Sequence, residues 1–270
     1  MIAAMAEVNV VNRRSSFRGA GWARLLALFL LLGMTFACGG GGASSGPPPP
    51  TTPTFVSEAH SATDGFGSQF NSSTLSINVT GSNPMLLAAW QSEVDGGFPD
   101  GWVVQDNGVD GTEIVDTDGY SGGAGNRRFR IYYWPNPTQG AHTVSVANPY
   151  NGANELAFAV ILLNGVSQVT PVGTPVLDVS TDARTGESET TPSTTNDLVV
   201  HVIADQLITT GTLGSGETSR SLANDGKHAP TGDASLWIST KPGANGSTTV
   251  SSSGWASFVI NGVAIPVHGI

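Results

Sequence analysis

Acidic side chains between residues 95 and 118 are the first candidates for chemistry in this sequence. Aspartates alternate there with glycines in the stretches DNGVDGTE and DTDG. Calcium prefers several hard oxygen ligands on a backbone that turns sharply, so the pattern suggests a calcium site formed by Asp106, Asp110, Asp116 and Asp118. The spacing is not that of an EF-hand. The simpler interpretation is that these Asp-Gly and Asn-Gly pairs form turns between strands, and no other cofactor is expected.

A second candidate site lies in the stretch RRFRIYYWPNPTQGAHTVSV, residues 127–146, which gathers arginines and aromatics in a chain that is poor in both. In a strand, alternate residues face opposite sides, so Phe129, Ile131 and Tyr133 form the expected core face. The opposite set would then point outward as a candidate ligand-binding surface: Arg128, Arg130, Tyr132 and Trp134. The alternative is that Trp134 caps the core while the arginines pair with aspartates of the preceding loop.

Catalytic motifs are weak, and no catalytic residue is identified. The five histidines are far apart without metal-binding spacing, and His201, inside an apolar strand, is expected to be a core or sheet-face residue. Residues 119–123 (GYSGG) match G-x-S-x-G, but Gly, Asn and Arg follow where a nucleophile elbow needs a helix. Paired carboxylates for glycosidase chemistry could come from the acidic loops, but glutamate is scarce in the expected strands.

Composition favours an all-β fold that does not bind nucleic acid. Gly, Ser, Thr, Asn and Val dominate, which favours strands and turns. The 270 residues are 39% hydrophobic and 12% charged, enough to bury a core. The net charge is −10, and so acidic a surface repels phosphate backbones.

Short apolar runs separated by turns predict an antiparallel two-sheet β-sandwich over residues 54–270, of jelly-roll type. STLSINVT alternates, with Leu75, Ile77 and Val79 on one face. ELAFAVILL and DLVVHVIAD are almost continuously apolar, which predicts central strands covered on both faces.

An approximate internal repeat predicts two related halves within that sandwich. NPMLLAAW is echoed by NDLVVHVI, and WPNPTQGAHTVSV is echoed by WISTKPGANGSTTVSS. A third pair is AFAVILLNGV (157–166) and ASFVINGV (256–263). Each half alone would expose one sheet face, so the halves are expected to share one sandwich. The alternative is that strand-turn-strand units look alike by composition.

The segments quoted above also resemble an uncharacterised module of secreted and surface proteins in environmental bacteria. In that module a WYxxNPxxG-like segment is followed by a GVxQxTP-like one, here Gly165–Pro171, and by a DLVV strand and a KPG turn, here 197–200 and 241–243. The resemblance covers residues 75–265. It implies a β-sandwich in an extracellular setting and transfers no reaction or ligand.

The N-terminus has the order of a bacterial lipoprotein signal. Four arginines precede the apolar run LLALFLLLGMTFA (25–37), and the only cysteine, Cys38, follows directly. This order predicts a signal peptide over residues 1–37, lipidation of Cys38, and a Gly/Ser/Pro tether over 38–53. Thr35 and Phe36 depart from the usual motif, and the alternative is an ordinary signal peptide.

These features predict an exported, membrane-anchored lipoprotein of the outer membrane or cell surface. The expected function is non-catalytic binding or adhesion, with a carbohydrate or another surface polymer as ligand. The first alternative is a passive structural or assembly component of the envelope. The second is a polysaccharide hydrolase or lyase.

Overall fold

The computed structural model describes residues 51–64, 72–94, 101–122, 125–147, 153–179, 184–205, 211–224, 234–258 and 260–270. The chain divides into two units, Met1–Pro47 and Pro48–Ile270, and all described residues belong to the second. The expected signal peptide, Cys38 and the tether up to residue 50 lie outside the described residues. Among the described residues, no helix is long and apolar enough to cross a membrane.

The described residues form four antiparallel sheets, two inner and two outer. Inner sheet 1 has the order β1-β9-β3-β7-β6: β1 Thr54–Asp64, β9 Ala153–Asn164, β3 Met85–Val94, β7 Gly125–Pro135 and β6 Thr112–Gly122. Outer sheet 1 has the order β2-β8-β4-β5: β2 Ser72–Val79, β8 Gly140–Ala147, β4 Val103–Asp106 and β5 Val109–Asp110.

The other two sheets come from the second half of the chain. Inner sheet 2 has the order β10-β17-β12-β15-β14: β10 Val176–Val179, β17 Asn261–His268, β12 Asp197–Asp205, β15 Ser235–Pro242 and β14 Thr218–Ala223. Outer sheet 2 has the order β11-β16-β13: β11 Arg184–Ser193, β16 Gly246–Phe258 and β13 Thr212–Leu213.

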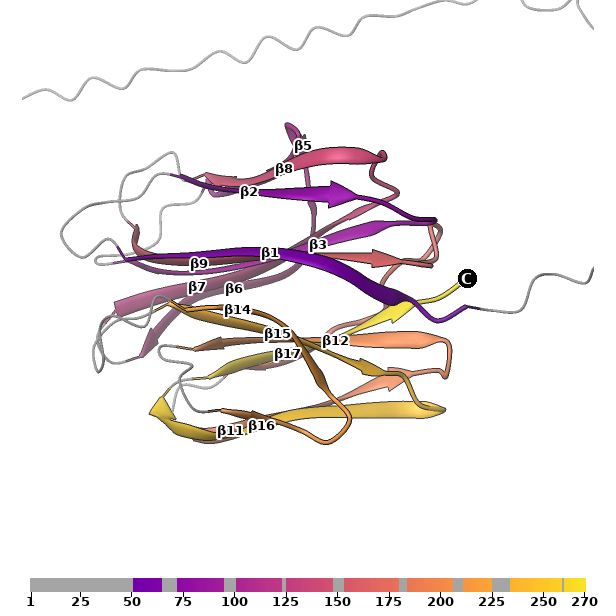
Figure 1. Cartoon of the computed structure of the whole chain (residues 1–270). Coiled ribbons are helices and arrows are strands. Elements are labelled where there is room, and N and C mark those ends of the chain that lie inside the picture. Colours follow the sequence, from indigo (N-terminus) through magenta and orange to yellow (C-terminus); the bar gives the residue numbers. More distant parts are fainter. Residues whose placement is uncertain are drawn as a thin grey trace, which may run out of the picture. The chain divides into compact units, whose positions relative to one another are not determined.

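The sheets stack in four layers, in the order outer 1, inner 1, inner 2, outer 2 (Figure 1). We call each outer-inner pair a sandwich, so the first sandwich comes from the first half of the chain and the second from the second half. Between the two inner sheets lies a large apolar core that includes Leu87, Phe129, Ile161, Val200 and Ile238. This central core joins the two sandwiches.

Both inner sheets are covered on both faces, as the continuous apolar runs predict. All residues of β12 and residues 155–163 of β9 are buried. The expected fold class is therefore confirmed as an all-β sandwich, but the expectation that two halves share one sandwich is wrong. Each half forms its own two-sheet sandwich, because strands that are apolar on both sides need a covering layer on each.

The two sandwiches have the same topology, and each has the strand order of a jelly roll. In the first, β1-β9-β3-β7 faces β2-β8-β4-β5; in the second, β10-β17-β12-β15 faces β11-β16-β13. Two of the three sequence echoes correspond, since β12 takes the place of β3 and the β15–β16 turn that of the β7–β8 turn. The third is out of register, because β17 is the counterpart of β9 but residues 256–258 still belong to β16.

Candidate functional site

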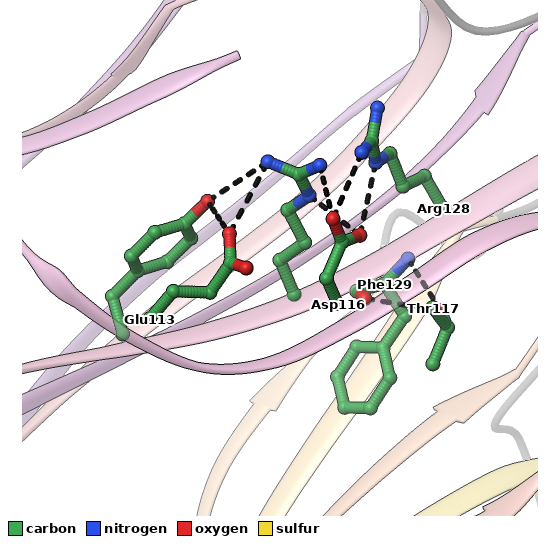
Figure 2. Close-up of polar contacts among 7 residues, drawn as sticks. Glu113, Asp116, Thr117, Arg128 and Phe129 are labelled. Carbon is green, nitrogen blue, oxygen red and sulfur yellow. Dashed lines mark hydrogen bonds and ion pairs between the residues drawn. The ribbon is translucent and has the colours of Figure 1, made fainter. Parts of the chain in front are cut away.

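Four of the predicted ligand-binding and calcium-site residues meet in one network on the first sandwich. Asp116 of β6 accepts hydrogen bonds from Arg128 Nε at 3.2 Å and Nη2 at 3.0 Å, and from Arg130 Nε at 2.8 Å, all from β7. Arg130 Nη1 donates to the Tyr132 hydroxyl at 3.1 Å, which donates to Glu113 Oε2 at 2.7 Å (Figure 2). These charges are therefore engaged with one another.

Burial and hydrogen bonding shift the pKa values of Tyr132 and Arg130 in this network. Burial raises the pKa of Tyr132, and its hydrogen bond to Glu113 raises it further. Burial opposes the charge of Arg130, but the contacts with Tyr132 and Asp116 outweigh it and raise its pKa. Tyr132 therefore stays a neutral hydrogen-bond donor, and Arg130 stays a cation.

The predicted outward face of β7 is wrong. Arg128 is only 2% exposed, and Tyr132 and Trp134 are buried in the apolar interior of the first sandwich. Trp134 donates from Nε1 to the carbonyl of Val109 at 3.0 Å. The face points inward because outer sheet 1 covers it. The alternative interpretation is the one the structure supports, with Trp134 in a core and both arginines paired with an aspartate.

Three of the four aspartates suggested for calcium have described side chains, and these three do not share one site. Asp106 is buried against His142, with Oδ2 2.7 Å from Nδ1, whereas Asp116 holds the two arginines. Asp110 Oδ1 accepts a hydrogen bond from Gln105 Nε2 at 2.9 Å. Asp118 lies in β6, but its side chain is not among those described.

The stretch suggested as a calcium loop is a two-residue hairpin turn. Asn107 has φ of 47° and Gly108 of 82°, and Asp106 pairs with Val109 across the turn. Positive φ at both central residues favours Asn-Gly and matches the twist of the flanking strands. Turn formation therefore accounts for this part of the acidic motif.

A buried ionic cluster that the sequence analysis missed lies inside the second sandwich. Glu187 and Glu189 point inward from β11, His201 points toward them from β12, and Glu217 reaches the same histidine from just before β14. The side chains of His201, Glu187 and Glu217 are completely buried, and that of Glu189 is 1% exposed. We call these four residues the Glu-His centre.

The two nitrogens of His201 have different surroundings. Nδ1 lies 2.9 Å from Glu217 Oε2. Nε2 lies 3.2 Å from both oxygens of Glu187 and 3.3 Å from Glu189 Oε2. The Glu217 carboxylate also accepts hydrogen bonds from Ser239 Oγ and from the backbone N–H of Ser251, each at 2.7 Å. One side of the ring is therefore fixed, and the other faces a pair of carboxylates.

Burial and charge shift every pKa in the centre. Burial raises the pKa of Glu189 to about 8, and the adjacent Glu187 carboxylate adds to the rise. Burial opposes ionisation of Glu187 and Glu217, but contact with His201 outweighs it and lowers both pKa values. Burial also opposes protonation of His201, yet its carboxylate neighbours raise the pKa well above its usual value. The centre therefore keeps His201 protonated, and burial favours the neutral form of Glu189.

A glycine makes room for this centre. A Cβ atom on Gly262 of β17 would lie 2.5 Å from Glu187 Oε2 and closer still to Glu189 Oε1. Because real Cβ atoms do not approach other atoms so closely, a side chain here would displace the carboxylates. The centre therefore depends on β17 as well as on its own strands.

The histidine in the first sandwich is built differently. His142 contacts the Asp106 carboxylate through Nδ1 and the carbonyl oxygen of Thr138 through Nε2, at 2.7 Å each. Its ring is satisfied on both sides by one carboxylate and one backbone oxygen. His142 therefore fits a structural role, whereas His201 faces three carboxylates.

The sequence contained a signal for the Glu-His centre. Glu187 and Glu189 are two apart in RTGESETTPS, so in a strand they face one side together, and His201 interrupts DLVVHVIAD. Neither pattern shows that the two faces oppose each other across a sandwich. Glu217 has no local signal, because it approaches from the segment before β14.

No protein-family model, curated protein or solved structure matches the chain.

Proposed function

We propose that this chain is an exported, lipid-anchored β-sandwich protein of the outer membrane or cell surface that works by binding rather than catalysis. Its proposed ligand is a carbohydrate or another uncharged surface polymer. The order of signal peptide, Cys38 and tether supports the anchor, and the resemblance to a bacterial surface module supports the setting. Thr51, near the end of the tether, donates its N–H to the carbonyl of Ile270 at 2.6 Å.

The observation that supports binding is the hydroxyl-rich outer face of each sandwich. On outer sheet 1, Thr74 pairs with Ser145 and Ser76 with Thr143. On outer sheet 2, Ser188 pairs with Ser251 and Thr190 with Thr249, whose hydroxyls are 2.8 Å apart. The side chains of these cross-strand pairs are uncharged, on a chain of net charge −10. Such faces suit hydrogen bonding to a neutral polymer better than ionic recognition.

The alternative is a passive structural or assembly component of the envelope. The observation that favours it is the burial of Trp90, Trp102, Tyr132, Trp134 and Trp255. Aromatic rings stack on sugars only when a face is exposed, so these rings are not available for stacking. Carbohydrate binding on the described outer faces would then rely on hydroxyl contacts rather than on these rings.

A polysaccharide hydrolase or lyase is less well supported. Such an enzyme needs paired carboxylates that the sugar can reach. Glu187 and Glu189 are adjacent, but their side chains are buried inside the second sandwich. A polymer cannot reach them without opening the sheets.

The test of binding is a pull-down of the full chain with a panel of neutral and acidic polysaccharides. We expect retention on a neutral polymer, lost on changing Thr143→Lys and Thr190→Lys together. Val169→Lys is the control, because Val169 is 92% exposed and lies outside all four sheets. Absence of retention on every polymer would reject binding in favour of the passive component.

The anchor is tested separately. Cys38→Ser should move the protein from the membrane fraction to the soluble fraction, because the acyl chains provide the membrane affinity. Unchanged fractionation would contradict a lipid anchor at Cys38 and leave the binding test unaffected.

A further inference from the structure

We propose that Glu187, Glu189 and His201 form a binding site for a divalent transition-metal ion, with Zn²⁺ the best fit, which ties the two sheets of the second sandwich together. One carboxylate from each glutamate and Nε2 of His201 are the protein ligands. The three ligand atoms come from two facing strands, β11 and β12, and lie within 4.8 Å of one another.

The distances fit ligands of one ion better than direct hydrogen bonds. Hydrogen bonds between charged groups are typically about 2.7–2.9 Å long, and the Nδ1–Glu217 distance of 2.9 Å agrees. The Nε2 distances to Glu187 and Glu189 are longer, at 3.2 and 3.3 Å. Zinc bonds of about 2.0–2.2 Å place two ligands of the same ion roughly 3.0–3.5 Å apart.

Three of the four oxygens on these two carboxylates lack a hydrogen-bond partner among the described residues. Both oxygens of Glu189 and Oε1 of Glu187 are buried and make no hydrogen bond within the described residues. Counting backbone and side chain together, Glu189 is only 2% exposed. A buried carboxylate without hydrogen bonds is costly, and an ion between Glu187, Glu189 and His201 would satisfy these oxygens together.

Glu217 serves as the positioning residue. A metal-bound histidine usually donates its other ring N–H to a carboxylate, which fixes the ring and its tautomer. Glu217 accepts at Nδ1 in this way, and Ser239 and Ser251 fix the Glu217 carboxylate in turn. This arrangement directs Nε2 at the two other glutamates, so Nε2 can bind an ion there once it has lost its proton.

The donor set selects the class of ion. Calcium takes about 6–8 oxygen ligands, whereas Glu187 and Glu189 together offer four oxygens beside a nitrogen. Imidazole nitrogen with carboxylate oxygen suits zinc and neighbouring first-row ions. Two carboxylates also neutralise a divalent charge, which matters in a site with no exposed side chain.

The test compares the full chain, purified in detergent, before and after unfolding and refolding with a chelator. The probes are Zn²⁺, Co²⁺, Mn²⁺ and Ca²⁺, followed by metal analysis and by thermal unfolding. We expect one equivalent of Zn²⁺ or Co²⁺ per chain, a higher unfolding midpoint with Zn²⁺, and visible absorption from bound Co²⁺. Ca²⁺ should give no stoichiometric binding.

Substitutions distinguish a metal-binding site from an ion cluster that has only a structural role. Glu217→Gln should lower Zn²⁺ affinity about 10- to 100-fold, and Glu189→Gln, which keeps the side-chain shape, should lower it further. His142→Gln is the matched control, because His142 is a buried histidine beside a carboxylate in the other sandwich. It should leave Zn²⁺ binding unchanged.

Three results would overturn the proposal: no ion retained and no midpoint shift, binding of Ca²⁺ alone, or Zn²⁺ binding that Glu189→Gln leaves unchanged. If Glu189→Gln does not fold, Glu217→Gln decides the question. Unchanged Zn²⁺ affinity in Glu217→Gln would then overturn the proposal.

Discussion

The interiors of the two sandwiches share a topology but not a chemistry. Between inner and outer sheet 1 lies a continuous apolar core containing Leu75, Trp90, Trp134, Phe158 and Leu162. Between inner and outer sheet 2, the apolar side chains form two small clusters, one of Ile203, Trp255 and Ile260 and the other of Val199, Val250 and Ala264. The Glu-His centre lies in this second interior.

Strand register shows which residues take equivalent places. Ala88 of β3 pairs with Tyr132 of β7, and His201 of β12 pairs with Ser239 of β15. Ala88 in the first sandwich therefore occupies the position of His201 in the second. In the same way, Trp90 pairs with Phe158 and Ile203 pairs with Gly262. Trp90 is therefore equivalent to Ile203, and Phe158 is equivalent to Gly262.

The outer sheets correspond in the same way. Val79 pairs with Gly140 at the end of β2 as Ser193 pairs with Gly246 at the end of β11. Counting back from these pairs aligns Leu75 with Glu189. One topology can therefore close over an apolar core or over an ionic centre, provided that a bulky residue such as Phe158 is replaced by a small one such as Gly262.

The largest effect is expected from emptying the apolar interior. Phe158→Ala removes a fully buried ring, so the free energy of unfolding should fall by about 3–5 kcal/mol. Chemical denaturation measures it. A loss below about 1 kcal/mol would mean that the first interior does not depend on dense packing and would weaken the contrast between the sandwiches.

The next effect comes from giving the second interior the residues of the first. Glu187→Ser, Glu189→Leu and His201→Ala place there the residues found at Ser73, Leu75 and Ala88, and Glu217→Gln removes the remaining buried charge. Replacing a buried ionic group by apolar residues is often neutral or stabilising by about 1–4 kcal/mol. We expect this variant to unfold at higher denaturant concentration than the metal-free wild type and to lose any response to Zn²⁺. Strong destabilisation would show that the centre is needed for folding even without an ion.

A smaller effect is expected where the centre needs space. Gly262→Ala should destabilise the protein by about 1–3 kcal/mol, as overpacking does, because the new methyl group meets Glu187 and Glu189. The same change in a Glu189→Ala background should cost less, since the carboxylate is gone. Equal costs in both backgrounds would place the strain elsewhere.

The smallest effect is expected on the outer faces. Thr249→Val removes the hydroxyl that lies 2.8 Å from that of Thr190. Exposed substitutions of this kind usually change stability by less than about 0.5 kcal/mol. Denaturation should therefore show almost no change, and a loss above about 1.5 kcal/mol would indicate that this face is packed against something.

The sequence by itself determined the β-fold, the doubly covered strands and the repeat of two halves. Period-two alternation places Leu75, Ile77 and Val79 on one face, and continuous apolar runs such as β9 and β12 require cover on both sides. These are local patterns, so they can be identified without knowing what lies opposite. The Asn107-Gly108 turn was open to both interpretations for the same reason, because turn chemistry and calcium chemistry use the same residues.

Only the tertiary structure decided which faces are inside and which side chains meet. The sequence could show that Arg128 and Arg130 share a face, but only the stacking of outer sheet 1 on inner sheet 1 turns this face of β7 toward the interior. Likewise Glu187, Glu189 and His201 lie on strands of different sheets, and Glu217 and Gly262 come from still other segments. Their meeting depends on sheet stacking, and side-chain alternation within one strand carries no information about the layer that will face it.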